Sequence, residues 1–145
     1  MERDGKVLLI KESGTADKGK WNQPAGWIDV GEDPLAAVKR EVEEETGFEF
    51  TPTAFLGAYS LVRKDLEKKL GGIPHAIKLI FTGRISEQPT LQADGEAEEI
   101  KWFSPQEIEA MGPGELRDLD IKKEVKDYFA GKRYPLDLIR HTISQ

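Results

Sequence analysis

Three glutamates near the middle of the chain have the type and spacing to bind a divalent cation. Glu41, Glu44 and Glu45 stand in the run EVEEETG, within a segment that has the pattern of an amphipathic helix. At about 100° of rotation per residue, their carboxylates fall within about 100° of arc. Like charges repel at this spacing, and the C-terminal half of a helix disfavours anions, so a bound cation is the natural compensation. Clustered carboxylates suit hard cations, which predicts Mg²⁺, with Mn²⁺ as a substitute.

The same run has a simpler interpretation, because a glutamate-rich helix face is usually just solvated. We expect the acidic face to be distinct from the core face, which the stripe of Leu35, Val38 and Val42 predicts. The setting favours chemistry over simple solvation. An ordered series of glycine, glutamate and arginine precedes the acidic run at fixed distances.

The segment 26–48 resembles the signature of the Nudix (MutT-like) hydrolases. Gly26 is followed after five residues by Glu32 and after seven more by Arg40, which opens the run REVxEExGF, so every defined position is filled. The neighbouring WNQPAG and the later EIKWF also resemble this family, and the resemblance covers most of the chain, from about residue 4 to about residue 110. It implies an α+β fold, a Nudix-type α/β/α sandwich around a mixed β-sheet, with the signature as a catalytic loop–helix–loop.

The resemblance also implies roles for individual residues. Glu41 and Glu45 would be the main metal ligands, together with the backbone carbonyl of Ala25. Glu44 would be either a further ligand or the general base. Arg40 would orient one of these carboxylates through charge-assisted hydrogen bonds, although an arginine here also fits an ordinary surface ion pair.

Supporting roles follow for residues around the helix. Gly26 and Gly47 would serve backbone geometry. Glu32 would contact Arg40 or outer-shell water, or simply favour the positive end of the helix dipole. Some family members take their base from outside the signature, and the run GEAEE offers three candidates that also fit a solvated acidic turn: Glu96, Glu98 and Glu99.

The implied activity is Mg²⁺-dependent hydrolysis of a phosphoanhydride bond by a metal-activated water. The tail GKRYPLDLI, together with WNQPAG, resembles the Nudix subgroup called phosphatase NudJ, which acts on nucleoside di- and triphosphates and a thiamine-precursor pyrophosphate. Packing of Tyr134, Leu136 and Ile139 onto the domain explains the tail equally well. Two alternatives stay open: an ADP-ribose or nucleotide-sugar pyrophosphatase, and a non-catalytic nucleotide-binding module.

The elements that must position these residues follow from periodicity and turn signals. Asp33 caps the signature helix, Pro34 suits its first turn and Gly47 its end. Ser104 and Glu107 predict a capping box for a second helix. The other expected elements are strands over Lys6–Lys11, Thr53–Val62, Ala76–Ile85 and Glu99–Phe103, a mobile hairpin loop over Arg63–Pro74, and a last helix over about Glu115–Ala130.

Composition bounds the remaining possibilities. The 145 residues suggest a single domain, 1–145, whose C-terminal helix and tail occupy about residues 115–145. A net charge of −6 argues against nucleic acid polymers and anionic membranes, and the lack of cysteine excludes disulfides and thiolate metal sites. No signal peptide is recognised, so we expect a cytoplasmic monomer or homodimer. Asp4-Gly5 predicts a hairpin whose partner strand lies upstream, where only Met1–Arg3 remain; the chain starts late or the fold lacks that strand.

Overall fold

The structure is a computed structural model that describes residues 1–14 and 16–144. Its strands are β1 (Glu2–Arg3), β2 (Lys6–Glu12), β3 (Trp21–Asn22), β4 (Phe50–Val62), β5 (His75–Ile85) and β6 (Ala97–Phe103). Its α-helices are α1 (Pro34–Thr46), α2 (Glu67–Leu70), α3 (Pro105–Ala110) and α4 (Ile121–Phe129), and two 3₁₀ turns are η1 (Lys64–Leu66) and η2 (Leu136–Leu138). None of the described helices is long and apolar enough to cross a membrane.

Strand β2 is the centre of the fold, and it is buried on both faces. It pairs antiparallel with β6 on one side and with the short strands β1 and β3 on the other. Side chains alternate along a strand, so Val7 and Leu9 face the cluster that includes residues of α3 and α4, whereas Leu8 and Ile10 face Phe48, just after α1. Helical layers on both faces of the sheet confirm the α+β class.

The two ends of β2 settle two expectations about strand pairing. The strand expected upstream is present as β1, which a tight turn with positive φ at Asp4 and Gly5 joins to β2. At the other end, a parallel bridge joins Trp21 of β3 to Leu116, beside the antiparallel pairs. This parallel contact is what makes the sheet mixed.

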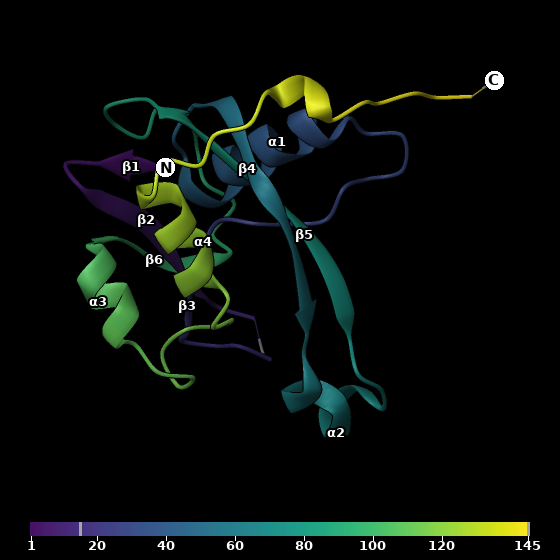
Figure 1. Ribbon diagram of the computed structural model, residues 1–145. Coiled ribbons are helices and arrows are strands. Elements are labelled where there is room, and N and C mark those ends of the chain that lie inside the picture. The colour runs from purple at the N-terminus through teal and green to yellow at the C-terminus, as the bar shows by residue number, and fades with distance from the viewer. Residues whose placement is uncertain (15, 145) are drawn as a thin grey trace.

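Strands β4 and β5 form a long antiparallel hairpin that projects from the rest of the molecule (Figure 1). The sequence predicts a mobile loop over Arg63–Pro74 at its tip. The structure places η1 and α2 there, and Gly71 ends α2 with φ of 70°. The hairpin connection lies where the sequence predicts it, and the short helical turns within it fit the Lys- and Leu-rich run 64–70, whose residues favour helix.

The C-terminal part begins with α3, where Ser104 and Glu107 form the predicted capping box. The next helix differs from expectation: α4 begins at Ile121, not near Glu115. Residues 115–117 run beside β3 instead, where Leu116 is fully buried in the core. Tertiary pairing of this segment overrides its local helical pattern.

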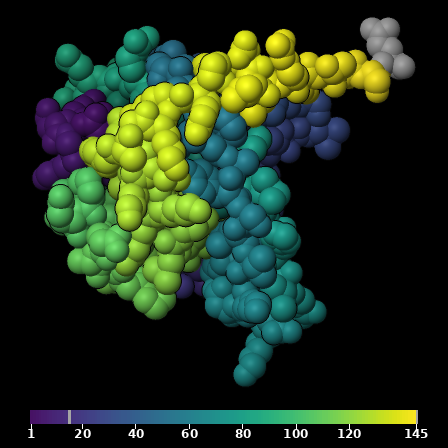
Figure 2. All heavy atoms as spheres, in the orientation of Figure 1, coloured from purple at the N-terminus to yellow at the C-terminus, as the bar shows by residue number. Residues whose placement is uncertain are grey.

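The tail returns to the hairpin after Gly131. Tyr134 exchanges two backbone hydrogen bonds with Phe55 of β4, of 2.8 and 2.9 Å. Its side chain stays exposed, whereas Leu136 and Ile139 are half-buried. Figure 2 shows the tail crossing the surface over β4 and then leaving the body of the molecule. The tail therefore attaches mainly through its backbone, with partial packing of two apolar side chains.

Candidate active site

Helix α1 begins and ends where its sequence dictates. The Asp33 carboxylate accepts the N–H of Leu35 at 2.7 Å, and Pro34 occupies the first turn, where a backbone N–H has no partner within the helix. Gly47 ends the helix in the left-handed conformation, with φ of 73°. These ends confirm the expected helix and fix which of its residues face the preceding loop, 26–33.

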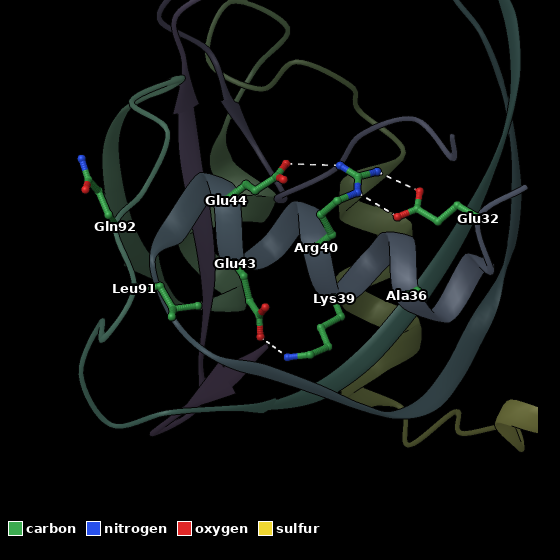
Figure 3. A pocket seen from close by; sticks show the side chains of 8 residues that line it. All are labelled: Glu32, Ala36, Lys39, Arg40, Glu43, Glu44, Leu91 and Gln92. Carbon is green, nitrogen blue, oxygen red and sulfur yellow. Dashed lines mark hydrogen bonds and ion pairs between the residues drawn. The ribbon is translucent and has the colours of Figure 1, made fainter. Parts of the chain in front are cut away.

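Arg40 joins α1 to that loop (Figure 3). Its Nε and Nη2 donate to the two carboxylate oxygens of Glu32, at 2.8 and 2.9 Å. Its Nη1 donates to Glu41 at 2.7 Å and to Glu44 at 3.2 Å, and its Nη2 to the Trp27 carbonyl at 3.1 Å. The bonds from Arg40 lower the pKa of the Glu32 carboxyl to about 2 and raise the pKa of the guanidinium. One arginine thus holds the loop and two of the three clustered carboxylates.

Glu45 is the buried carboxylate of the group, and its residue is 7% exposed. Its Oε2 accepts the N–H of Ala25 at 2.9 Å, which ties the residue before Gly26 to the last turns of α1. Burial raises the pKa of Glu45 to about 8, and the negative charges of Glu12, Glu41 and Asp94 contribute to the rise. The side chain is therefore a desolvated acid among other acids, an environment that favours a bound cation.

The three glutamates differ in exposure. The side chain of Glu44 is 48% exposed and that of Glu41 is 18% exposed. The expectation that all three lie apart from the core face is wrong for Glu45, which is buried along with Val42. Seven residues make nearly two helical turns, so Glu45 falls on the same line of the helix as Val38. The acid cluster consequently runs from the core to the surface.

Two glycines allow close approach of the chain on either side of α1. A Cβ at Gly26 would stand 2.0–2.2 Å from the carboxyl atoms of Glu41, so only glycine leaves room for that carboxylate. A Cβ at Gly47 would stand 2.7 Å from the carbonyl oxygen of Leu91, and the Gly47 carbonyl accepts the N–H groups of Thr90 and Leu91. A side chain at either position would therefore collide with a neighbouring group.

A pocket of about 490 Å³ opens along the outer side of α1 (Figure 3). Arg40 and Glu44 lie in its wall, and Leu91 and Gln92 form the opposite side. Glu45 is not part of this wall. The pocket therefore gives solvent access to the surface end of the acid cluster.

The three acids of the run GEAEE contact residues other than the glutamates of α1. Glu99 pairs with Lys11 at 3.3 Å, and Glu98 lies 3.9 Å from Lys18. Glu96 is exposed, and its N–H donates to Asp94 at 2.8 Å. All three are exposed, Glu96 before the strand and Glu98 and Glu99 on β6 itself, so only Glu96 lies in a turn.

Two acids that the sequence analysis did not select lie close enough to Glu45 to affect it: Glu12 and Asp94. The N–H of Asp94 donates to the backbone carbonyl of Glu44 at 2.7 Å, which places this loop against the end of α1. Glu12 comes from the end of β2, far away in the sequence. No local pattern marks either residue, because only the tertiary fold brings them to the helix.

Four carboxylates share one arrangement: Glu12, Glu41, Glu44 and Glu45. In each, one oxygen accepts hydrogen bonds and the other has no hydrogen-bond donor within residues 1–14 and 16–144. Glu32 differs, because Arg40 occupies both of its oxygens. Within those ranges, no three acidic or histidine side chains converge as a complete metal site. The anchored carboxylates thus keep free oxygens, but these do not converge on a single point in this structure.

Comparison with known proteins identifies the family. The model of the NUDIX domain matches residues 1–125. The chain belongs to the NUDIX family. It is 29% identical to phosphatase NudJ of Escherichia coli K12 over 137 residues, which cover 94% of this chain and 83% of that protein. Among solved structures, a NUDIX hydrolase from Nitrosomonas europaea is 34% identical, with a TM-score of 0.83 over 97% of this chain and 91% of that one.

More distant structures show the same fold. An ADP-ribose pyrophosphatase from Streptococcus suis matches with a TM-score of 0.62 and 19% identity, over 92% of this chain and 89% of that one. Together, the family model and the nearer relatives show that the chain is a Nudix pyrophosphohydrolase. The segment 26–48, whose helix and loop Arg40 joins, lies within the residues that the family model matches.

The donor set fits the divalent metal ions that Nudix hydrolases generally use. All available side-chain ligands are carboxylate oxygens, which bind hard cations such as Mg²⁺ and Mn²⁺. Burial and the neighbouring acids raise the pKa of Glu45, so its charged form is disfavoured in the protein alone. A divalent cation beside Glu45 and Glu41 would favour that charged form.

Proposed function

We propose that this Nudix enzyme is a Mg²⁺-dependent hydrolase of phosphoanhydride bonds in nucleoside di- and triphosphates or related small pyrophosphates. The observation that carries the proposal is the buried carboxylate of Glu45 beside Glu41, since an anionic pyrophosphate would be repelled by these acids alone. The resemblance to phosphatase NudJ along nearly the whole chain supports the substrate class.

Glu41, Glu45 and the backbone carbonyl of Ala25 would hold the cation. When bound, Mg²⁺ neutralises phosphate oxygens and lowers the pKa of a coordinated water. The Ala25 N–H fixes Glu45, and the absence of a side chain at Gly26 leaves space for Glu41. The protein thus orients its ligands before the substrate arrives.

Glu44 would act as the general base. Its side chain is half-exposed and reaches the pocket, while Arg40 holds one of its oxygens at 3.2 Å and leaves the other free to accept a proton. In the reaction, a water oxygen forms a bond to phosphorus, the bond between that phosphorus and the bridging oxygen breaks, and the water proton passes to Glu44. Arg40 acts by orientation, because its donors are already engaged by glutamates.

The test is a substrate panel with Mg²⁺ or with EDTA, read by release of phosphate and of pyrophosphate. The panel contains nucleoside di- and triphosphates, ADP-ribose, nucleotide sugars and dinucleoside polyphosphates. We expect turnover of simple nucleotides that EDTA abolishes. Glu45→Gln should lower kcat at least about 100-fold, since even the loss of an outer-shell partner costs a metal site about 10–100-fold. Glu109→Gln, on the exposed side of α3, is the matched control and should keep wild-type turnover.

The other outcomes assign other functions. Turnover confined to ADP-ribose or nucleotide sugars would support phosphoanhydride hydrolysis but contradict the proposed class of substrates. Nucleotide binding without turnover of any compound would show that the protein is a nucleotide-binding module and not an enzyme. Equal turnover by wild type and Glu45→Gln contradicts the assigned metal ligands.

A further inference from the structure

Arg117 is fixed beside the segment that leads into the Nudix signature. Its backbone N–H donates to the Trp21 carbonyl at 2.9 Å, and the Trp21 N–H donates to the Glu115 carbonyl at 2.7 Å. Residues 115–117 thereby extend the sheet next to β3, whose chain continues directly to Ala25. The backbone position of Arg117 is therefore set by strand-like pairing.

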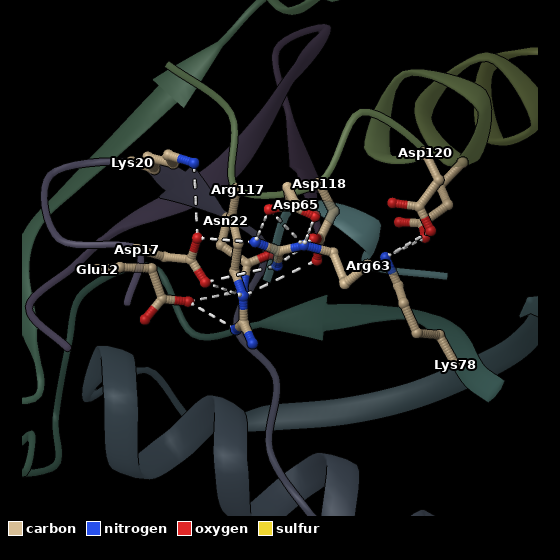
Figure 4. A network of polar contacts seen from close by, with 11 residues as sticks. Glu12, Asp17, Lys20, Asn22, Arg63, Asp65, Lys78, Arg117, Asp118 and Asp120 are labelled. Carbon is tan, nitrogen blue, oxygen red and sulfur yellow. Dashed lines mark hydrogen bonds and ion pairs between the residues drawn. The ribbon is translucent and has the colours of Figure 1, made fainter. Parts of the chain in front are cut away.

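The side chain of Arg117 reaches the end of β2 (Figure 4). Its Nη1 donates to Oε1 of Glu12 at 3.0 Å, and Asn22 Nδ2 donates to the same oxygen at 2.8 Å. Its Nε lies 3.3 Å from Oδ2 of Asp17, and Arg63 binds the other oxygen, Oδ1, at 3.0 Å. Arg117 is consequently held from two sides, with its outer nitrogen directed at Glu12.

Glu12 in turn faces the buried end of the acid cluster. Side chains alternate along β2, so Glu12 lies on the same face as Leu8 and Ile10, the face that packs against Phe48 at the end of α1. The Glu12 carboxylate is 19% exposed, and its charge acts on Glu45. With Oε1 occupied by two donors, Oε2 is the oxygen available to the cluster.

We propose that Arg117 is a positioning residue of the metal site, acting through Glu12, whose carboxylate it holds beside Glu45. The inference rests on the proposed metal-dependent function. Arg40 acts on Glu41 in the same way: it donates to one carboxylate oxygen and leaves the second oxygen free. Each arginine limits the negative charge of its glutamate and fixes the direction of the unoccupied oxygen.

The magnitudes favour an effect on metal affinity over one on stability. The Arg117 side chain is 37% exposed, and an ion pair of that exposure contributes little to folding. An outer partner that orients a metal ligand, in contrast, changes metal affinity by about 10–100-fold. Without Arg117, the Glu12 side chain can rotate. Cation binding must then also order this carboxylate, and that cost weakens the affinity for the cation.

The test is a double-mutant cycle on Mn²⁺ affinity, measured by direct titration of the full chain without substrate. The cycle compares wild type, Glu12→Gln, Arg117→Met and the double variant. We expect about 10–100-fold weaker binding for Glu12→Gln and about 10-fold weaker binding for Arg117→Met. The double variant should bind as Glu12→Gln does, because Arg117 acts only through that carboxylate. Asp65→Asn, which alters the same polar network without touching Glu12, is the control and should bind as wild type.

Two results would overturn the proposal: wild-type Mn²⁺ affinity of Arg117→Met, or additive losses in the double variant. Thermal unfolding of each variant establishes that it is folded, and Arg117→Lys takes the place of a methionine variant that is not. Lysine keeps the charge but lacks the forked donors of arginine. A wild-type protein that neither binds Mn²⁺ nor cleaves any pyrophosphate refutes the proposed function itself, which separates the two failures.

Discussion

Gly26 lies directly against the carboxylate of Glu41. A Cβ built on Gly26 would stand 2.0–2.2 Å from the carboxyl carbon and both oxygens. The obstruction is the mobile end of a side chain and not backbone, so Glu41 can move away at little cost to the fold. A side chain at Gly26 should therefore displace a residue of the candidate site while leaving the stability of the fold almost unchanged.

The substitution Gly26→Ala tests this expectation. We expect kcat/KM to fall about 100-fold, because displacing a catalytic group by about 1 Å has an effect of that size. The melting temperature should change little. Gly72→Ala is the control, since a Cβ there meets no atom within 4 Å. Unaltered kcat/KM for Gly26→Ala would show that Glu41 need not occupy its present position.

The metal-free protein should carry a pH signature of Glu45. Its pKa is about 8 when folded against an ordinary value of 4.5, so the folded state binds this proton more tightly. The contribution of Glu45 to stability is therefore fully present below pH 4.5 and is lost as pH rises through 8. In EDTA, Glu45→Gln should gain in melting temperature relative to wild type over that range. A pH-independent difference between the two proteins would contradict the raised pKa.

Glu32 should show the opposite dependence. The bonds from Arg40 lower the pKa of its carboxyl from 4.5 to about 2, so its contribution to stability is present above pH 4.5 and is lost as pH falls through 2. Glu32→Gln should be less stable than wild type at neutral pH, with the difference closing under acid conditions. Urea unfolding of both proteins at a series of pH values measures this. A difference that stays constant down to pH 2 would argue against the Arg40–Glu32 clamp.

Arg63 should be a major contributor to stability (Figure 4). Its guanidinium is buried and binds Asp17 at 3.0 Å and Asp118 at 2.7 Å. Arg63→Met leaves two buried carboxylates without this partner and should lower the free energy of unfolding by about 3–5 kcal/mol. Asp65→Asn removes a partner whose side chain is 56% exposed, so its effect should stay under about 1 kcal/mol. Similar urea midpoints for the two variants would contradict this ranking.

Local patterns in the sequence predict the signature helix and its environment well. The cap at Asp33 and the end at Gly47 depend on residues within one helical turn, and both are confirmed. The α4 prediction fails because residues 115–117 pair with β3, a contact about a hundred residues apart in the chain. Glu12 and Asp94 escape local analysis for the same reason, since nothing near either residue in the sequence indicates the proximity to Glu45.

The span of the Glu12–Arg117 contact also bears on the order of folding. These residues are 105 positions apart, whereas Arg40 and Glu32 are 8 apart. Short-range contacts close quickly and long-range ones slowly, because more chain entropy is lost in closing the larger loop. The signature helix and its clamp can therefore form early, while the pairing with Arg117 waits for β2 and β6 to join. During synthesis, Glu12 therefore lacks the Arg117 donor until residue 117 has emerged and its segment has paired with β3.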